Sequence, residues 1–254
     1  MNLLKNLAVA LAMYSKIPVP QFEWKKEHMR FALLFFPLVG VICGALVCLW
    51  GRISALLPLG TNFVTAVYLL IPVAVTGGIH LDGLLDTADA LASWQTRERR
   101  LEILGDSHAG AFAVIACCAY FLAAFGIWSE LTLRGASLLA AGFIVSRALS
   151  GFCVAAFPCA KESGLAAAFA ENADKRKVRA GLLIEAAAGA ALMIWQAPLC
   201  GILAAAAAVL TLLWYRRLSI KKFGGITGDT QGFFLQICEL AMALAVMIGE
   251  KIPI

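Results

Sequence analysis

Seven stretches of the sequence are apolar and long enough, or nearly long enough, to cross a lipid bilayer. A helix needs about 20 largely apolar residues to span the hydrocarbon core. Apolar residues make up 61% of the chain and charged residues 15%, against about 45–50% and about 25% in soluble domains. The sequence therefore predicts an all-α, polytopic membrane bundle, organised as one domain over residues 1–254. The seven stretches are Phe31–Ile53, Phe63–Ile79, Ala111–Trp128, Ala136–Phe157, Ala180–Trp195, Pro198–Tyr215 and Phe233–Ile248.

Residues 1–20 precede these stretches, and their apolar run is too short to cross a bilayer. Lys5 and Asn6 interrupt it, and Pro18 and Pro20 stop any helix that begins there. We therefore expect an amphipathic helix that lies in the membrane interface.

Lys and Arg residues are distributed unevenly among the connecting segments. Sixteen of the 21 lie before the first stretch or after the second, fourth and sixth, whereas Arg52, Arg134 and Lys251 lie on the other side. Segments rich in Lys and Arg stay in the cytoplasm, so the bias predicts an alternating topology with the C-terminus outside. A nucleic-acid partner is not expected, because no basic stripe is interleaved with exposed aromatic residues.

The segment 77–90, Gly-Gly-Ile-His-Leu-Asp-Gly-Leu-Leu-Asp-Thr-Ala-Asp-Ala, carries three aspartates at spacings of four and three. On a helix Asp82, Asp86 and Asp89 fall within about 40° of one another. Three carboxylates on one face repel unless a cation, a raised pKa or water offsets their charge. Carboxylate oxygens favour Mg²⁺ or Mn²⁺ over zinc. A solvated helix end is the alternative interpretation.

Two further polar segments are predicted on the same side of the membrane, so that residues 77–110 and 221–232 form the candidate active-site motifs. Asp106 and Ser107 directly precede the third stretch, where they can cap a helix, bind a ligand, or both. Residues 221–232 combine three glycines in five residues with Asp229. Glycines let backbone amides approach an anion, although this segment is not a Walker A motif.

Arg147 lies near the middle of the fourth stretch, where an arginine costs at least ~2.5 kcal/mol on insertion scales. It predicts either an ion pair, for which Glu239 is a candidate, or a phosphate contact. His80 borders the acidic face, and a structural role is as compatible with its position as a catalytic one. The long connection 161–179 is expected to cover the site.

These segments resemble the adenosylcobinamide-GDP ribazoletransferase family, also called cobalamin-5′-phosphate synthases. The resemblance covers nearly the whole chain, from Ser15-Lys-Ile-Pro-Val-Pro20 and Phe36-Pro-Leu-Val-Gly40 onward. Its most specific parts are residues 77–89, Asp106-Ser-His-Ala-Gly110 and Gly224-Gly-Ile-Thr-Gly-Asp-Thr230.

The resemblance implies a Mg²⁺-dependent enzyme of the cytoplasmic membrane whose active site faces the cytoplasm. The 3′-hydroxyl of α-ribazole, or of its 5′-phosphate, attacks the phosphoryl group on adenosylcobinamide-GDP, and GMP leaves. A homo-oligomer or association with other corrinoid-assembly enzymes is also compatible with the family. The catalytic candidates are His80, Asp82, Asp86 and Arg147; the substrate-binding candidates are Arg100, Ser107, Gly225, Thr227, Gly228 and Thr230; and the metal-ligand candidates are Asp82, Asp86, Asp89, Asp106 and Asp229.

Two other classes of protein stay open on the residues alone. One is another membrane transferase that acts on a metal-bound diphosphate, such as a prenyltransferase or a CDP-alcohol phosphotransferase. The other is a transporter, which is expected to carry acidic residues deep within several spans. The aspartates gather at one side of the membrane, and this position favours chemistry at the interface.

Overall fold

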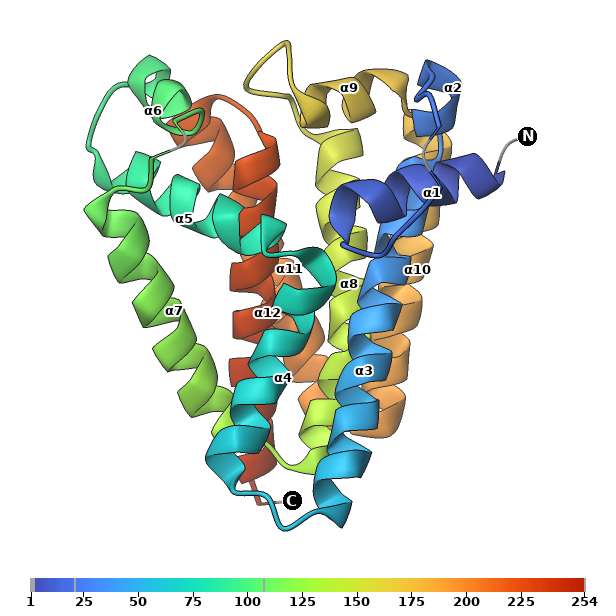
Figure 1. Cartoon of the computed structure of the whole chain (residues 1–254), viewed down its shortest axis with the longest axis vertical. Helices are drawn as coiled ribbons and strands as arrows, with labels where there is room; N and C mark the ends of the chain where they lie inside the picture. The colour runs from blue at the N-terminus through green and yellow to red at the C-terminus, as the bar shows by residue number, and fades with distance from the viewer. Residues whose placement is uncertain (1–2, 21, 107, 254) are drawn as a thin grey trace.

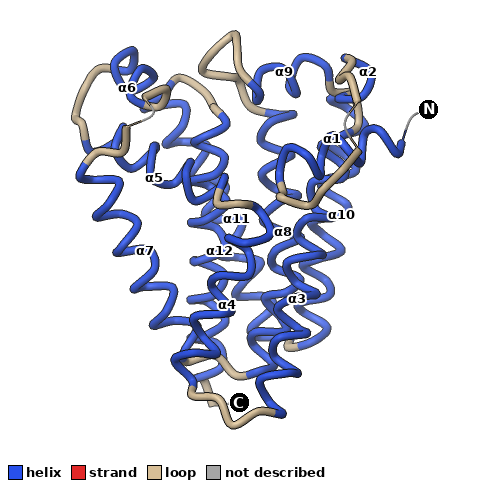
Figure 2. Tube along the Cα trace, viewed as in Figure 1, coloured by secondary structure: helices blue, strands red, loops and turns tan. Residues whose placement is uncertain are grey.

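The computed structural model describes residues 3–20, 22–106 and 108–253, and this part of the chain is helical with no strand (Figure 2). The only extended pairing in it is an isolated parallel bridge between Cys159 and Ile226. The helices, in chain order, are α1 Leu3–Tyr14, α2 Lys26–Met29, η1 Ala32–Phe35, α3 Phe36–Leu56, α4 Thr61–Thr76, α5 Ile79–Ala92, α6 Arg97–Ile103, α7 Ala111–Ser129, α8 Leu133–Ala156, α9 Leu165–Asn172, α10 Lys175–Gln196, α11 Pro198–Phe223 and α12 Gly228–Lys251.

Six helical segments within the described residues are each long and apolar enough to cross a membrane: η1 with α3, α7, α8, α10, α11 and α12. The helix pair α4 and α5 meets the same criteria only when taken together, which gives up to seven spans. Many of the large apolar side chains stand exposed, for example Leu122 at 75% on α7. A surface of this kind is stable against lipid tails, so the predicted membrane bundle is confirmed.

Helix α8 forms the centre of the bundle, and most of its side chains are buried. Helix α3 approaches it at Gly40 and Gly44, where a Cβ atom would lie 2.3 Å from the Phe143 carbonyl oxygen and 2.5 Å from that of Ala140. Small residues at this spacing let two helix backbones touch. The central helix is therefore held by direct backbone contact.

The second predicted span ends earlier than its hydropathy indicated. Helix α4 stops at Thr76, and Gly77 and Gly78 follow with φ of +66° and +81°. Two successive left-handed residues are accessible mainly to glycine, and they turn the chain so that α5 lies at 95° to α4. Helix α5 then runs across the bundle toward α6 and α7 (Figure 1).

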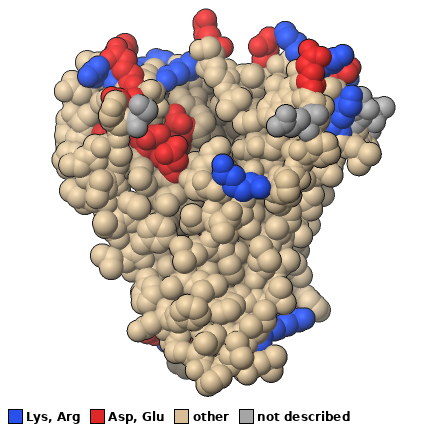
Figure 3. Space-filling view, viewed as in Figure 1, with Lys and Arg blue, Asp and Glu red and all other residues tan. Residues whose placement is uncertain are grey.

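The connections that carry the 16 Lys and Arg residues lie together at one end of the bundle, which we call the basic end. Helices α2, α6 and α9 lie there (Figure 1). Helix α1, which was predicted to be an interfacial helix, runs across the bundle near the same end. The α3–α4 and α7–α8 connections and the C-terminus lie at the opposite end. Figure 3 shows that charged side chains gather near the basic end, with few along the apolar body. The sequence-predicted grouping of the loops is thus confirmed.

Candidate functional site

The aspartates of α5 lie beside the start of α12 because the two helices touch at glycines. A Cβ atom on Gly83 would lie 2.5 Å from the carbonyl oxygen of Asp229, and one on Gly232 would lie 2.8 Å from that of His80. Without side chains at these two positions the backbones meet, and Asp82 is brought to Asp229. Residues separated by more than 140 positions therefore share one site.

Asp82, Asp86 and Asp229 form what we call the acidic cluster. Partial burial, followed by the charges of the other aspartates, raises the pKa of Asp86 to about 6. None of the three forms an ion pair with a described residue. Their mutual repulsion is therefore not offset by a direct cationic partner within the described part of the chain, so an added cation would be held favourably.

Two predicted metal ligands have other contacts. Both carboxylate oxygens of Asp89 accept backbone hydrogen bonds at the start of α7, from Gly110 at 2.5 Å and Ala113 at 2.9 Å. Asp89 thus caps α7, satisfying amides that have no partner inside the helix. Asp106 is exposed and accepts hydrogen bonds from His108, from its amide at 3.0 Å and with its ring at 2.8 Å. These contacts, chiefly the backbone one, lower the pKa of Asp106. Asp89 is thus hydrogen-bonded to the start of α7, and Asp106 lies outside the acidic cluster.

The glycine-rich motif is shorter than expected, because α11 continues to Phe223 and α12 begins at Gly228. Within it, the amides of Gly225 and Ile226 donate to the carbonyls of Ser219 and Pro158 at 3.2 and 2.9 Å. The amide of Thr227 donates to Thr230 Oγ1 at 2.9 Å. The predicted cradle of free amides is therefore not observed over these residues, since their donors are already used.

Four of the predicted substrate-binding residues belong to this junction. Thr227 and Thr230 form a capping box at the start of α12, and Thr230 also shares a hydrogen bond with the Tyr215 hydroxyl at 3.0 Å. Gly225 packs against the 158–160 backbone, where a Cβ would lie 2.5 Å from the Pro158 carbonyl oxygen. Gly228, in contrast, lines a cavity beside Asp229. Three of the four therefore have structural contacts, and Gly228 remains placed to meet a ligand.

Three cations that the sequence did not single out approach the site. The Arg97 guanidinium lies against Gly224, where a Cβ would be 2.0 Å from Arg97 Cζ. A Cβ atom on Gly105 would lie 3.9 Å from Lys161 Nζ, and the Lys161 charge acts on the carboxylate of Asp229. Lys16 lines an open groove of about 610 Å³ together with Asp82. None of the three forms an ion pair with a described residue.

The other predicted basic and polar residues near these motifs are less informative. Arg100 is half-buried on α6, and its Nε has no hydrogen-bond partner among the residues described. Ser107 lies outside the described residues. Their substrate-binding roles stay predictions.

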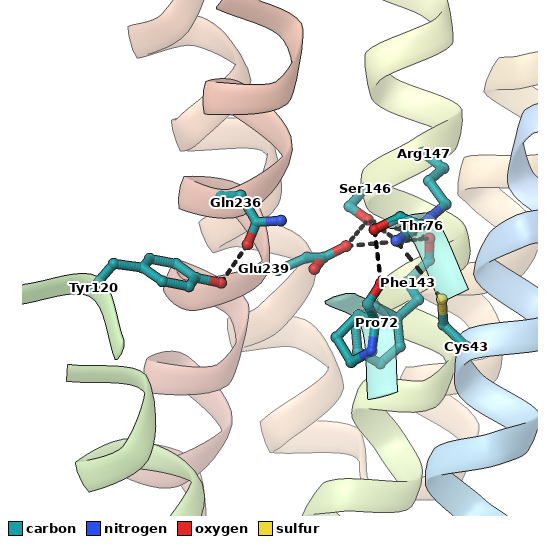
Figure 4. A network of polar contacts seen from close by, with 9 residues as sticks. All are labelled: Cys43, Pro72, Thr76, Tyr120, Phe143, Ser146, Arg147, Gln236 and Glu239. Carbon is teal, nitrogen blue, oxygen red and sulfur yellow. Dashed lines mark hydrogen bonds and ion pairs between the residues drawn. The ribbon is translucent and has the colours of Figure 1, made fainter. Parts of the chain in front are cut away.

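Arg147 is fully buried in the bundle and pairs with Glu239, Nη1 donating to Oε1 at 2.6 Å (Figure 4). It also donates to the Phe143 carbonyl at 3.1 Å, while Ser146 donates to the same Glu239 oxygen at 2.8 Å. The expected partner is confirmed. The alternative phosphate contact is not supported, because Arg147 is absent from the lining of the cavity beside the cluster.

His80, in the first turn of α5, is also buried, and its Nε2 has no hydrogen-bond partner in the described part of the chain. Its ring lies 5.6 Å from that of Phe36 and 6.4 Å from that of Tyr14. Burial, with a smaller contribution from Arg147, lowers its pKa to about 3. The imidazole is therefore neutral near pH 7, and a catalytic role for His80 stays a prediction.

A cavity of about 140 Å³ adjoins the acidic cluster. Asp82 and Asp229 line it, as do Gly228, Ser150 and Gln231. Leu165 and Ala166 of α9 form part of its wall. The segment 161–179, which was expected to cover the site, thus contributes these two residues to the cavity wall.

The donor set suits Mg²⁺, with one restriction. No three His, Cys, Asp or Glu side chains in the described residues are grouped closely enough to hold a metal by themselves. Mg²⁺ commonly binds through one or two carboxylates together with water and substrate phosphates. Asp82, Asp86 and Asp229 fit that shared mode of binding, because they are hard oxygen donors without a paired cation.

Comparison with known proteins identifies the family to which the chain belongs. The family model described as cobalamin-5-phosphate synthase matches residues 6–247. This chain belongs to the cobalamin-5-phosphate synthase family. Relatives within the family are named adenosylcobinamide-GDP ribazoletransferase. The protein of Lachnoclostridium phytofermentans is 44% identical over all of this chain and 97% of its own length. That of Desulfitobacterium hafniense is 35% identical over 95% and 96% of the two chains.

A more distant cobalamin-5-phosphate synthase relative, from Escherichia coli K12, is 32% identical over 93% of this chain and 97% of its own. It carries the same name, adenosylcobinamide-GDP ribazoletransferase. No solved structure matches the chain significantly.

Proposed function

We propose that this protein transfers a phosphoryl-linked corrinoid from adenosylcobinamide-GDP to α-ribazole, or to its 5′-phosphate, in the final assembly of cobalamin. The observation that carries the proposal is the contact of α5 with α12, which joins Asp82 to Asp229. Lys161 acts on the Asp229 carboxylate, and Arg97 lies against Gly224 at the end of α11. Carboxylates flanked by free cations are the arrangement that a metal-bound diphosphate requires. The named activity of the relatives supplies the substrates.

The reaction exchanges one phosphorus–oxygen bond for another. The 3′-hydroxyl oxygen of the acceptor forms a bond to the phosphorus that bears the cobinamide aminopropanol arm. The anhydride bond from that phosphorus to the GMP portion breaks, and GMP leaves with the bridging oxygen. The hydroxyl proton passes to solvent or to a nearby base, so the products are a phosphodiester and GMP.

Asp82, Asp86 and Asp229 would hold Mg²⁺ jointly with the diphosphate oxygens. When bound, the metal supplies charge neutralisation at the phosphates and at the departing GMP. The partial burial of the cluster strengthens these interactions relative to open water. Asp89 acts indirectly, since its capping of α7 fixes the far end of the acidic face.

Arg97 and Lys161 would contact the remaining phosphate oxygens. Arg97 presents a planar fork that can bind two oxygens at once, whereas Lys161 contributes a point charge. Arg97 reaches Gly224, at the end of α11, from α6, and Lys161 reaches Asp229 from the α8–α9 connection. The diphosphate would then be held from two sides. Holding it in this way orients the phosphorus toward the acceptor.

The membrane placement follows from the charge bias. The relatives compared are bacterial, and we propose the cytoplasmic membrane with the basic end inside the cell. Nucleotide-linked substrates would then reach the acidic cluster from the cytoplasm.

The decisive experiment mixes purified protein with adenosylcobinamide-GDP, α-ribazole and Mg²⁺ and identifies the products by mass. The expected result is cobalamin and GMP in equal amounts. Release of pyrophosphate, or no reaction at all with a correctly inserted protein, would contradict the proposal. The Asp82→Asn variant is the control for contaminating activity.

A further inference from the structure

The cavity beside the acidic cluster is built mainly from apolar and aromatic side chains. Tyr14 of α1 and Phe36 stack with their ring centroids 4.0 Å apart and an interplanar angle of 29°. Val154 of α8 and Leu165 of α9 add aliphatic walls. A flat apolar group would find ring faces and methyl groups there, the contacts that aromatic ligands prefer.

The polar groups of the cavity are few, and several already have partners. Ser150 donates to Gln231 Oε1 at 2.8 Å, and Gln231 Nε2 donates to the Tyr215 hydroxyl at 3.1 Å. The Nε2 atom of buried His80 has no partner among the described residues. A ligand with polar atoms all round its edge would meet apolar wall over most of that edge and, among the described lining residues, would find free carboxylate acceptors only at Asp82 and Asp229.

The size of the cavity separates the parts of the two substrates. An engineered cavity of about 150 Å³ in another protein accommodates benzene, and the cavity here is about 140 Å³. A corrin macrocycle is far larger than this. Guanine approaches the size but carries donors and acceptors around its edge, whereas the benzimidazole ring of α-ribazole presents an apolar edge.

We propose that this cavity binds the benzimidazole ring of α-ribazole, so that the attached ribose lies at the acidic cluster. Asp82 and Asp229 line the cavity and belong to the cluster as well, which places the acceptor hydroxyl beside the metal-bound phosphates. The inference rests on the proposed function, and it assigns the acceptor to the α1, α8 and α9 side of the site. The corrinoid part of the donor is then left outside the cavity.

Ala166→Phe tests this assignment, because its side chain lies on α9 and lines the cavity. The KM for α-ribazole is expected to rise by about tenfold or more, with the KM for adenosylcobinamide-GDP unchanged. Ala168→Phe is the matched control, since a residue two positions away points about 200° around the helix. It should leave both constants as in the wild type.

A second variant and a binding measurement keep the test independent of folding and turnover. Leu165→Ala removes apolar contact at an exposed position, and it should raise only the KM for α-ribazole, by a few fold. Isothermal titration of the free base 5,6-dimethylbenzimidazole into the detergent-solubilised protein should show weaker binding in Ala166→Phe than in Ala168→Phe.

The possible outcomes distinguish a wrong assignment of the cavity from a wrong proposed function. A rise in the KM for adenosylcobinamide-GDP instead, or equal loss of turnover with both constants unchanged, would overturn the assignment. Equal binding of the free base by the two phenylalanine variants would overturn it too. A wild-type protein that releases no GMP refutes the proposed function itself, and titration of the free base still reports on the cavity.

Discussion

Arg147 donates to Glu239 over 2.6 Å in the interior of the bundle, linking α8 to α12. Glu239 lies on the same helix as Asp229, and Arg147 lies one turn deeper than Ser150 of the cavity wall. Figure 4 shows Ser146 and Cys43 around the same pair. The pair therefore links the two helices that contribute to the site and does not line the cavity beside the acidic cluster.

This position predicts that Arg147 acts through packing and charge balance. Arg147→Met alone leaves the Glu239 carboxylate without its partner, and breaking a buried pair costs about 3–5 kcal/mol. The double variant Arg147→Met, Glu239→Met should recover most of the thermal stability in detergent and a substantial part of the GMP release. Stability restored without any activity would instead indicate that Arg147 contacts the substrate.

The acidic cluster predicts that substitutions of different aspartates will differ in their effect on activity. Asp82→Asn and Asp86→Asn should each reduce GMP release by about 100-fold or more, because a charge that holds the metal and phosphates is lost. Asp106→Asn is the control, since Asp106 is exposed and bonded to His108, and it should retain most activity. Loss of activity in all three variants to the same extent would argue against the cluster as defined.

The stability of the metal-free protein should depend on pH through Asp86. Its pKa is raised to about 6 in the folded state, from an ordinary value of 3.8, so the folded protein binds this proton more tightly than the unfolded chain. Stability should then fall as pH rises from about 4 to about 6. Thermal unfolding in chelator should show this decline, and Asp86→Asn should flatten it. A decline of the same size in Asp86→Asn would assign it to other groups.

Two of the unpaired cations, Arg97 and Lys161, predict an effect on the donor substrate. Arg97→Ala and Lys161→Ala should each raise the KM for adenosylcobinamide-GDP by about tenfold, the loss of one charge-assisted hydrogen bond. Arg99→Ala is the matched control on α6, because Arg99 is exposed and already pairs with Glu102 at 2.6 Å. Equal effects of all three substitutions would indicate a general electrostatic attraction.

Orientation can be tested by labelling single cysteines in a background from which the eight native ones are removed. A cysteine at Gln95, near the basic end, should react with an impermeant maleimide only after the cells are opened. One at Gly60, in the α3–α4 connection, should react in intact cells. The reverse pattern would place the acidic cluster outside.

Hydropathy and the distribution of Lys and Arg were sufficient to predict the bundle and the grouping of its loops. Each span is a long continuous apolar run, so it can be recognised from its own residues. Hydropathy placed the end of α4 late, since Ile79 continues the apolar pattern while Gly77 and Gly78 set the turn. It also placed the start of α12 late. Polar residues Thr227, Asp229 and Thr230 read as a loop, yet they cap and begin the helix.

The site was predictable in its aspartates and less so in its cations. Asp82 and Asp86 share a helix face that spacing alone reveals, and Asp229 follows from its motif. Arg97 and Lys161 belong to segments rich in charge, where nothing local marks the residue that approaches the site. Only packing against Gly224 and Gly105 distinguishes them. Asp89 carried the same pattern as its neighbours, although its partners are amides of another helix.

A short backbone pairing between residues 158–160 and Ile226 connects the segment before α9 to the segment before α12. Ala160 donates to the Ile226 carbonyl at 2.8 Å, and Ile226 donates back to Pro158 at 2.9 Å. The first of the paired segments continues into α9, and the second reaches Asp229 within three residues. Because these bonds involve only backbone atoms, they set the position of α9 relative to the start of α12 whatever side chains line the cavity. The shape of the cavity and the placement of Asp229 therefore share one backbone constraint.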